Sequence, residues 1–198
     1  MANRISGVTT LPDWTRPPRA EGWYAEDLDG PPGALRHTEL VDGVLVFRVS
    51  PQRRWHGRMV TALTNALVDS APEGVEVDRE FTIRLDQRNR PEPDIVVNTK
   101  PVADDQTWVE PSDVLLVVEV VSPESEHRDT TVKPRKYAEA GIPHYWIVEY
   151  GASGPVVHVY ELDRVTSTYA PAGIFRERLE RPVPFPVDLQ LSNLLRRS

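Results

Sequence analysis

The chain has 198 residues, 39% of them hydrophobic, which is enough for one substantial core and predicts a single domain. It contains no cysteine, which excludes disulfides and thiolate zinc sites and suits a reducing compartment. The formal net charge of −7 disfavours binding of a polyanion over the whole surface, so any affinity for nucleic acid is expected to be local.

Membrane and secretion signals are not found in the sequence. The apolar runs are far shorter than the roughly 20 residues that span a bilayer, and the N-terminus lacks the apolar segment of a signal peptide. We therefore expect a cytoplasmic protein without membrane contact.

The first third of the chain contains an arm, a hairpin and a helix. Residues 1–35 are rich in proline and glycine and predict an irregular arm with at most a short helix at 23–28, followed by a single domain over 36–198. Asp42-Gly43 lies between two apolar segments, which predicts a β-hairpin over 39–49. Apolar residues spaced by three and four over 54–69 predict an amphipathic helix that stops before Pro72.

Strands dominate the remainder of the prediction. Residues 75–85 alternate with period two, and 93–97 and 114–121 are short apolar runs. A helix is expected from about 131 to Gly141, with Pro134 in its first turn and Lys133 at its entry. Strands at 144–150 and 156–162 and an extended tail with a short terminal helix complete a mixed α/β sheet with flanking helices.

Two carboxylates stand where a carboxylate is costly. Asp94 precedes the apolar run 95–97, and Glu119 lies inside a run of aliphatic residues. An unpaired ionised carboxyl in such strands is expensive to desolvate, so each is expected to meet a cation, a metal or a proton. Side by side, the two strands would form a metal site; alternatively, each acid ends a strand and faces water or an arginine.

Several motifs in order resemble one known family. They are Glu39-Leu-Val-Asp-Gly, Pro93-Asp94, Glu119-Val-Val-Ser-Pro, the series Asp129, Lys133 and Tyr137, and 140–146 (AGIPHYW). Over about 36–195 this combination resembles the Uma-two family of restriction endonucleases, a branch of the PD-(D/E)XK nuclease superfamily. The resemblance implies a restriction-endonuclease-like core and hydrolysis of phosphodiester bonds in DNA.

The resemblance also implies a metal and its ligands. Asp94, Glu119 and the main-chain carbonyl of Val120 would hold Mg²⁺, for which Mn²⁺ can substitute. Oxygen donors suit this chemistry because Mg²⁺ is hard and strongly hydrated. Glu39 would lie in or near the metal cluster; a glutamate that enters a strand in solvent is the alternative, and Glu80 competes for the same role.

The catalytic lysine departs from the superfamily pattern. Val121 occupies the position two residues after Glu119, where that lysine is usual. Lys133 on the following helix is the expected replacement, sharing one face with Asp129 and Tyr137 if the helix begins early. The alternatives are a surface pair of Asp129 with Lys133, and Lys136 as the catalytic amine.

Basic residues cluster at 48–58 and 128–136 and are candidates for nucleic-acid contact, against the alternative of a solvated surface. The candidates are His56, Arg54, Arg128 and Lys136.

The family resemblance also suggests a homodimer. No HExxH, GxSxG or P-loop motif occurs, which leaves nuclease as the surviving hydrolase. The non-enzymatic alternative is an inactive or weak nuclease fold that serves as a binding or regulatory module.

Overall fold

The computed structural model describes residues 15–29, 37–47, 53–152 and 154–195. Much of the arm predicted for 1–35 lies outside these ranges. Within it, the short helix expected at 23–28 is a 3₁₀ turn, η2 (Ala25–Leu28). The division into an arm and one domain stays a prediction.

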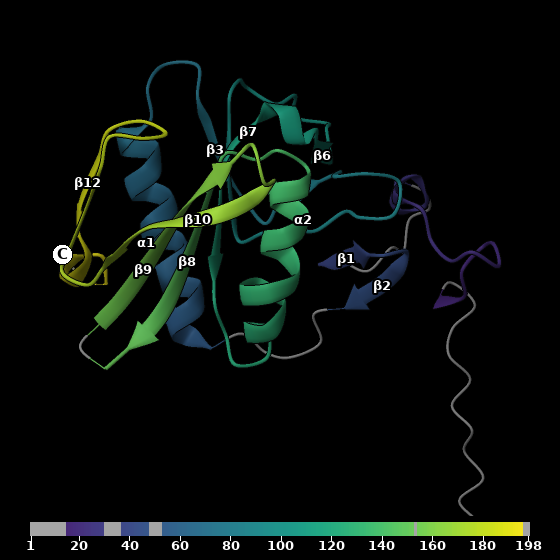
Figure 1. The fold of residues 1–198 in the computed structure, drawn as a ribbon, viewed down its shortest axis with the longest axis horizontal. Coiled ribbons are helices and arrows are strands. Elements are labelled where there is room, and N and C mark those ends of the chain that lie inside the picture. The colour runs from purple at the N-terminus through teal and green to yellow at the C-terminus, as the bar shows by residue number, and fades with distance from the viewer. Residues whose placement is uncertain (1–14, 30–36, 48–52, 153, 196–198) are drawn as a thin grey trace, which may run out of the picture.

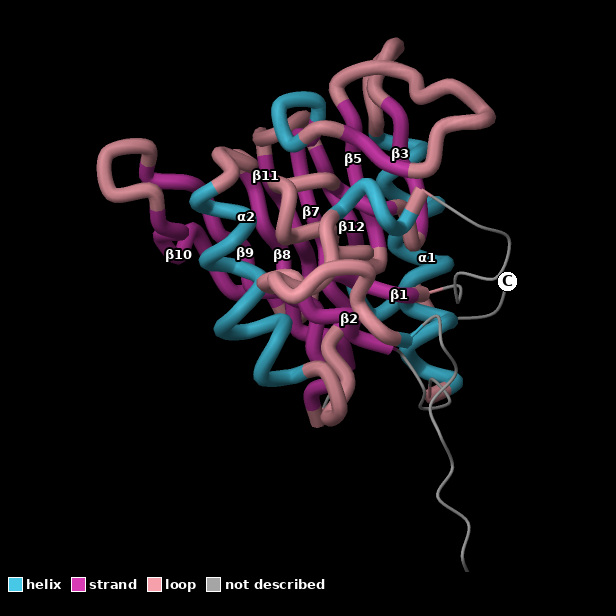
Figure 2. The backbone as a smooth tube through the Cα atoms, turned by 90° about the vertical axis from the view of Figure 1, so that its right-hand side faces the viewer, coloured by secondary structure: helices cyan, strands magenta, loops and turns pink. Residues whose placement is uncertain are grey.

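A mixed six-stranded sheet forms the centre of the molecule, in the order β10-β9-β8-β7-β5-β3. Figure 2 shows this order from one edge to the other. The strands are β3 (Glu76–Arg79), β5 (Ile95–Asn98), β7 (Val114–Val120), β8 (His144–Gly151), β9 (Gly154–Asp163) and β10 (Thr168–Phe175). Only β7 and β8 run parallel; the other neighbours in this sheet are antiparallel. The expected mixed α/β sheet is confirmed.

Helices cover both faces of the sheet, because alternate residues of its central strands bury against different helices (Figure 1). Val97 and Val118 pack in the core beneath α1 (Arg54–Ser70), whereas Val96 and Val117 pack with Tyr137 of α2 (Lys133–Glu139). The predicted helix over 54–69 is confirmed. The hairpin β11 (Arg178–Arg181) and β12 (Val187–Gln190) and the 3₁₀ turn η5 (Leu191–Asn193) complete the α1 side.

The predicted N-terminal hairpin is also confirmed over the described residues, whereas residues 48 and 49 of the predicted range lie outside them. β1 (Thr38–Val41) pairs with β2 (Val44–Phe47) across an Asp42-Gly43 turn whose two residues have positive φ angles, 51° and 77°. Asp-Gly is a favoured sequence for such a turn, since glycine adopts positive φ without steric cost. The hairpin lies beside α2 (Figure 1).

Two elements differ from the expectation. The strand over 75–85 is broken at Glu80, whose φ of 50° turns the chain, so that β4 (Thr82–Ile83) pairs with β6 (Trp108–Val109) instead of β5. The second helix begins before residue 131, since a π-helical turn (Arg128–Val132) leads directly into α2. Lys133 therefore lies inside a helical segment and not at its entry. The 3₁₀ turn η3 (Pro111–Asp113) leads into β7.

Candidate functional site

Pairing of β5 with β7 brings the two predicted acidic positions together. Asp94 directly precedes β5, and Ile95 pairs with Val118, which places Asp94 opposite the segment that contains Glu119. The backbone N–H of Val120 donates a hydrogen bond to Asp94 Oδ2 at 2.7 Å. Both carboxylates are at most 2% exposed, so the alternative in which each faces water is wrong.

Lys133 lies at the centre of the carboxylates. Its Nζ is 2.8 Å from Glu39 Oε1, 2.9 Å from Glu119 Oε1 and 3.4 Å from Asp129 Oδ1. Lysine is rarely buried unless it is paired, and this one is 3% exposed. The early start of the helical segment puts Asp129 and Lys133 on one face, as the four-residue spacing requires. The alternative of a surface pair is therefore wrong.

Glu39 is fully buried on β1 and accepts a second hydrogen bond, from the backbone N–H of Glu92 at 3.0 Å. The alternative of a solvent-facing Glu39 is thus excluded. Glu80, the competing candidate, contacts this region through its backbone. Its N–H donates a hydrogen bond to the carbonyl of Asp94 at 3.2 Å.

Tyr137 supports Glu119 from the same helical face as Lys133. Its hydroxyl donates to Glu119 Oε1 at 3.1 Å, and the ring is fully buried. Burial, and then the negative charges of Glu119 and Glu39, raise the pKa of Tyr137 well above its ordinary value. The phenol therefore stays protonated at physiological pH and acts as a hydrogen-bond donor.

Asp129 is a buried carboxyl whose pKa is raised above its ordinary value. Burial raises its pKa, the charge of Lys133 lowers it in part, and the charges of Asp94 and Glu39 raise it further. Asp94 and Glu39 therefore lie close enough to act electrostatically on Asp129. We call Glu39, Asp94, Glu119 and Asp129 the acid cluster.

Two contacts were missed by reasoning from the sequence. Glu92, two residues before Asp94, is 7% exposed and lies 2.7 Å from His37 Nδ1 through its Oε1. His56 of α1 is also buried, and its Nε2 lies 3.2 Å from Asp94 Oδ2. The Pro-Glu-Pro-Asp run around Glu92 was a usable signal, whereas the partner of His56 depends on the packing of α1 on the sheet.

The predicted nucleic-acid contacts lie in different environments. His56 and Lys136 are buried and paired with Asp94 and Asp42, which does not fit a role at the surface. Arg54 is exposed at the start of α1. Arg128 is half-buried in the π-helical turn, and its Nε is shielded from solvent.

The chemistry of the acid cluster fits a hard divalent cation. Three buried carboxylates, those of Glu39, Glu119 and Asp129, contact the Lys133 ammonium, and Asp94 is a fourth buried acid nearby. Excess negative charge at low exposure favours a bound cation or a proton. Carboxylate oxygens together with the Val120 carbonyl are the donors that Mg²⁺ prefers. Across the described part of the chain, no three His, Asp or Glu side chains stand in a ready-made metal arrangement, and Lys133 Nζ lies among three of these carboxylates.

Comparison with known proteins supports the fold. A solved structure described as a putative nuclease belonging to DUF820 from Anabaena variabilis ATCC 29413 matches with a TM-score of 0.63 and 16% sequence identity. The match covers 85% of this chain and 94% of that chain. A search of curated proteins finds no match. None of the described helices is both long and apolar enough to cross a bilayer.

The match to a family model covers most of the chain, residues 25–194, and with it the hairpin, the sheet and both helices that position the acid cluster. The model is that of Uma2 (Uma-two), described as "Putative restriction endonuclease". The α/β sheet with its N-terminal hairpin is accordingly restriction-endonuclease-like. The chain belongs to the Uma2 family.

Proposed function

We propose that this protein is a divalent-metal-dependent endonuclease that hydrolyses phosphodiester bonds of DNA. The observation that carries the proposal is the contact of Lys133 Nζ with Glu119 Oε1 at 2.9 Å. Val121 leaves the usual lysine position without an amine, and α2 supplies one to the same carboxylate. The site therefore holds two acids from adjacent strands and a lysine, as the proposed chemistry needs.

Asp94, Glu119, Glu39 and the carbonyl of Val120 are the groups that would hold the metal, Mg²⁺ or Mn²⁺ in its place. When bound, such an ion supplies Lewis-acid stabilisation of a phosphate and lowers the pKa of a coordinated water. Hydrogen-bonding contacts would orient these carboxylates: Val120 N–H and His56 contact Asp94, Glu92 N–H contacts Glu39, and Tyr137 contacts Glu119.

Lys133 would act on the scissile phosphate and its attacking water. An ammonium donates hydrogen bonds and stabilises the negative charge that develops on phosphate oxygens in the transition state. Its present partners, three carboxylates, keep its Nζ at the centre of the acid cluster. Asp129, whose pKa burial raises, is the nearby group suited to accept a proton.

The family supports DNA as the proposed substrate, and the net charge of the chain limits how DNA could be bound. A net charge of −7 weakens general attraction to DNA, so binding would rely on local positive groups such as Arg128 and on the metal. Homodimer formation and a cytoplasmic location belong to the same proposal.

A plasmid-nicking assay tests this function. We expect the purified protein to nick supercoiled DNA with Mg²⁺ or Mn²⁺, and chelation to stop the reaction. Asp94→Asn and Glu119→Gln should each abolish nicking and weaken Mn²⁺ binding measured by calorimetry. Asp104→Asn, at an exposed position in the segment between β5 and β6, is the matched control and should behave as the parent.

Unchanged ion binding and unchanged nicking in both variants would contradict the site assignment. Binding of DNA without cleavage under any divalent ion would instead favour the non-enzymatic alternative, a nuclease fold used as a binding or regulatory module.

A further inference from the structure

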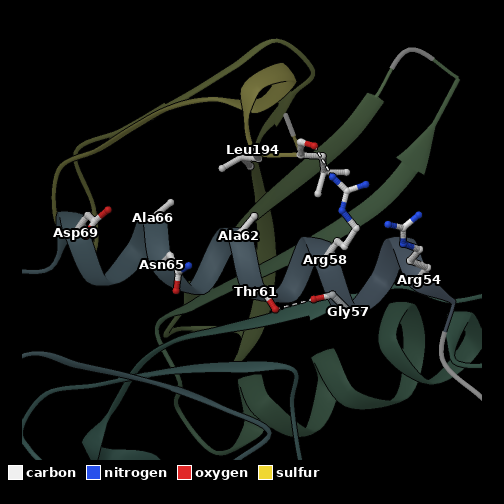
Figure 3. A pocket seen from close by; sticks show the side chains of 10 residues that line it. Arg54, Gly57, Arg58, Thr61, Ala62, Asn65, Ala66, Asp69 and Leu194 are labelled. Carbon is white, nitrogen blue, oxygen red and sulfur yellow. Dashed lines mark hydrogen bonds between the residues drawn. The ribbon is translucent and has the colours of Figure 1, made fainter. Parts of the chain in front are cut away.

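A groove of about 660 Å³ runs along the outer face of α1, on the side of the helix opposite to its buried core residues (Figure 3). Its helix side is lined by small residues, Gly57, Ala62 and Ala66, and by the larger polar residues Arg58, Thr61 and Asn65. Leu194 and Leu195 form one wall, and Arg58 anchors that wall by donating a hydrogen bond to the carbonyl of Leu195 at 2.5 Å. The groove is therefore built from two segments far apart in sequence and is open along the helix.

Two residues of opposite charge lie at the two ends of this helix face. Arg54 lies at the N-terminal end of α1 and Asp69 at its C-terminal end, as Figure 3 shows. Fifteen residues of helix separate them, or roughly 22 Å at 1.5 Å per residue. Both side chains are exposed, and neither forms an ion pair within the ranges that the structure describes.

We propose that this face is the contact between two copies of the chain, with the α1 helices packed antiparallel about a twofold axis. The axis would pass between Thr61 and Ala62, midway along the face. Each Arg54 then lies opposite Asp69 of the other copy, and the contact occurs twice because a twofold interface is self-complementary. Because Arg58 and Asn65 also lie on this face, we expect the two helix axes to lie at the wider end of the range of about 8–10 Å that packed helices show.

A second copy suits this face better than nucleic acid does. The carboxylate of Asp69 would repel a phosphate backbone, whereas it matches the arginine of an antiparallel helix. The inference assigns Arg54 to this contact in place of the nucleic-acid contact expected from the sequence. It gives the homodimer named in the proposed function a specific surface and register, and it does not depend on nuclease activity, since assembly can be measured without any substrate.

One helix pair with its flanking wall is smaller than a standard interface of about 800 Å² per partner. We therefore expect a reversible dimer with a dissociation constant on the order of micromolar. Sedimentation velocity of the full chain over a concentration series through this range should show a monomer–dimer equilibrium.

Charge substitutions test the register. Arg54→Glu and Asp69→Arg each place like charges opposite one another twice, so each single variant should weaken dimerisation at least tenfold. The double variant carrying both changes restores opposite charges and should recover the parental dissociation constant. Both positions are exposed, so circular dichroism should show an unchanged fold.

Disulfide trapping gives an independent readout, because the natural chain has no cysteine. Ala62→Cys places one thiol beside the proposed axis and should yield a covalent dimer on mild oxidation. Val165→Cys, at a position 93% exposed, is the matched control and should yield far less.

A monomer at all concentrations would overturn the inference, as would failure of the double variant to recover or equal crosslinking of the two cysteine variants. Arg54→Glu that lowers DNA affinity without changing the mass would assign this arginine to nucleic-acid contact instead. Loss of nicking activity in any of these variants would not bear on the proposed dimer.

Discussion

Lys136 donates a hydrogen bond to Asp42 at 2.6 Å, and this pair repeats the contact of Lys133 with Glu39 three residues further along both segments. On α2 the two lysines are about one helical turn apart. On the hairpin, Glu39 lies in β1 and Asp42 lies in the turn that follows it. The hairpin is thus fastened to α2 by two successive lysine–carboxylate contacts, one buried and one at the rim.

The outer contact should position the inner one. We expect Lys136→Met and Asp42→Asn each to lower the rate of DNA nicking about tenfold at saturating substrate, because the hairpin no longer holds Glu39 against Lys133. Arg135→Met removes a different charge from the same helix, one that pairs with Glu139 in an exposed contact, and should leave the rate unchanged. A parental nicking rate in both Lys136→Met and Asp42→Asn would contradict this positioning role.

The same pair has a defined pH dependence. The hydrogen bond from Lys136 lowers the pKa of Asp42 below its ordinary value of 3.8. A carboxyl with a lowered folded-state pKa contributes stability above the unfolded pKa, and this contribution disappears as the pH falls through the lowered value. The difference in the free energy of unfolding between the parent and Asp42→Asn should therefore be constant from pH 5 to 7, which is about one pH unit or more above the unfolded-state pKa of 3.8. The difference should shrink as the pH falls below 3.8.

Removal of the central ammonium should separate folding from metal binding. Lys133→Met leaves buried carboxylates without their cation, and breaking a buried ion pair of this kind costs about 3 to 5 kcal/mol. We expect a lower melting temperature without metal, a larger stabilisation by Mn²⁺ than in the parent, and no nicking. The larger stabilisation follows because Lys133 and a divalent cation share the same carboxylates, and nicking stops because the amine proposed to act on the phosphate is lost.

Calorimetry and thermal denaturation in chelator and in Mn²⁺ provide the measurement. Arg135→Met again serves as the control on the same helix. Full nicking activity in the Lys133 variant would show that its amine is not catalytic, and a parental response to Mn²⁺ would show that it does not share the ligands.

Asp78 on β3 should act in the opposite sense to Asp42. Burial, and then the charge of Glu76, raise the pKa of Asp78 above its ordinary value of 3.8, while the hydrogen bond from Asn98 lowers it in part. A carboxyl with a raised folded-state pKa destabilises the fold when it is ionised, and this cost disappears as the pH falls through the raised pKa to below 3.8.

Asp78→Asn keeps an acceptor for Asn98 and removes the charge. We expect it to raise the free energy of unfolding at pH 7 and to lose this advantage when urea denaturation is repeated below pH 3.8. Asp104→Asn, at an exposed position, should give no such difference between the two pH values. A variant less stable than the parent at pH 7 would contradict the prediction.

The sequence by itself determined the elements whose signal is local. The Asp42-Gly43 turn, the helix that carries His56 and the apolar strands around Asp94 and Glu119 follow from turn chemistry and from periodicity within a few residues. The cost of placing carboxylates in such strands also pointed to the site, because desolvation depends on the residues immediately around each acid.

The tertiary structure alone decided which groups meet at those acids. Lys133 reaches Glu39 across 94 residues of chain, and His56 reaches Asp94 across 38. The break at Glu80 and the π-helical turn before α2 likewise override the local pattern. Periodicity shows which side of a strand or helix is buried. The convergence of charged side chains depends instead on how strands pair and how helices pack. The free energy of that packing comes from contacts between residues distant in sequence.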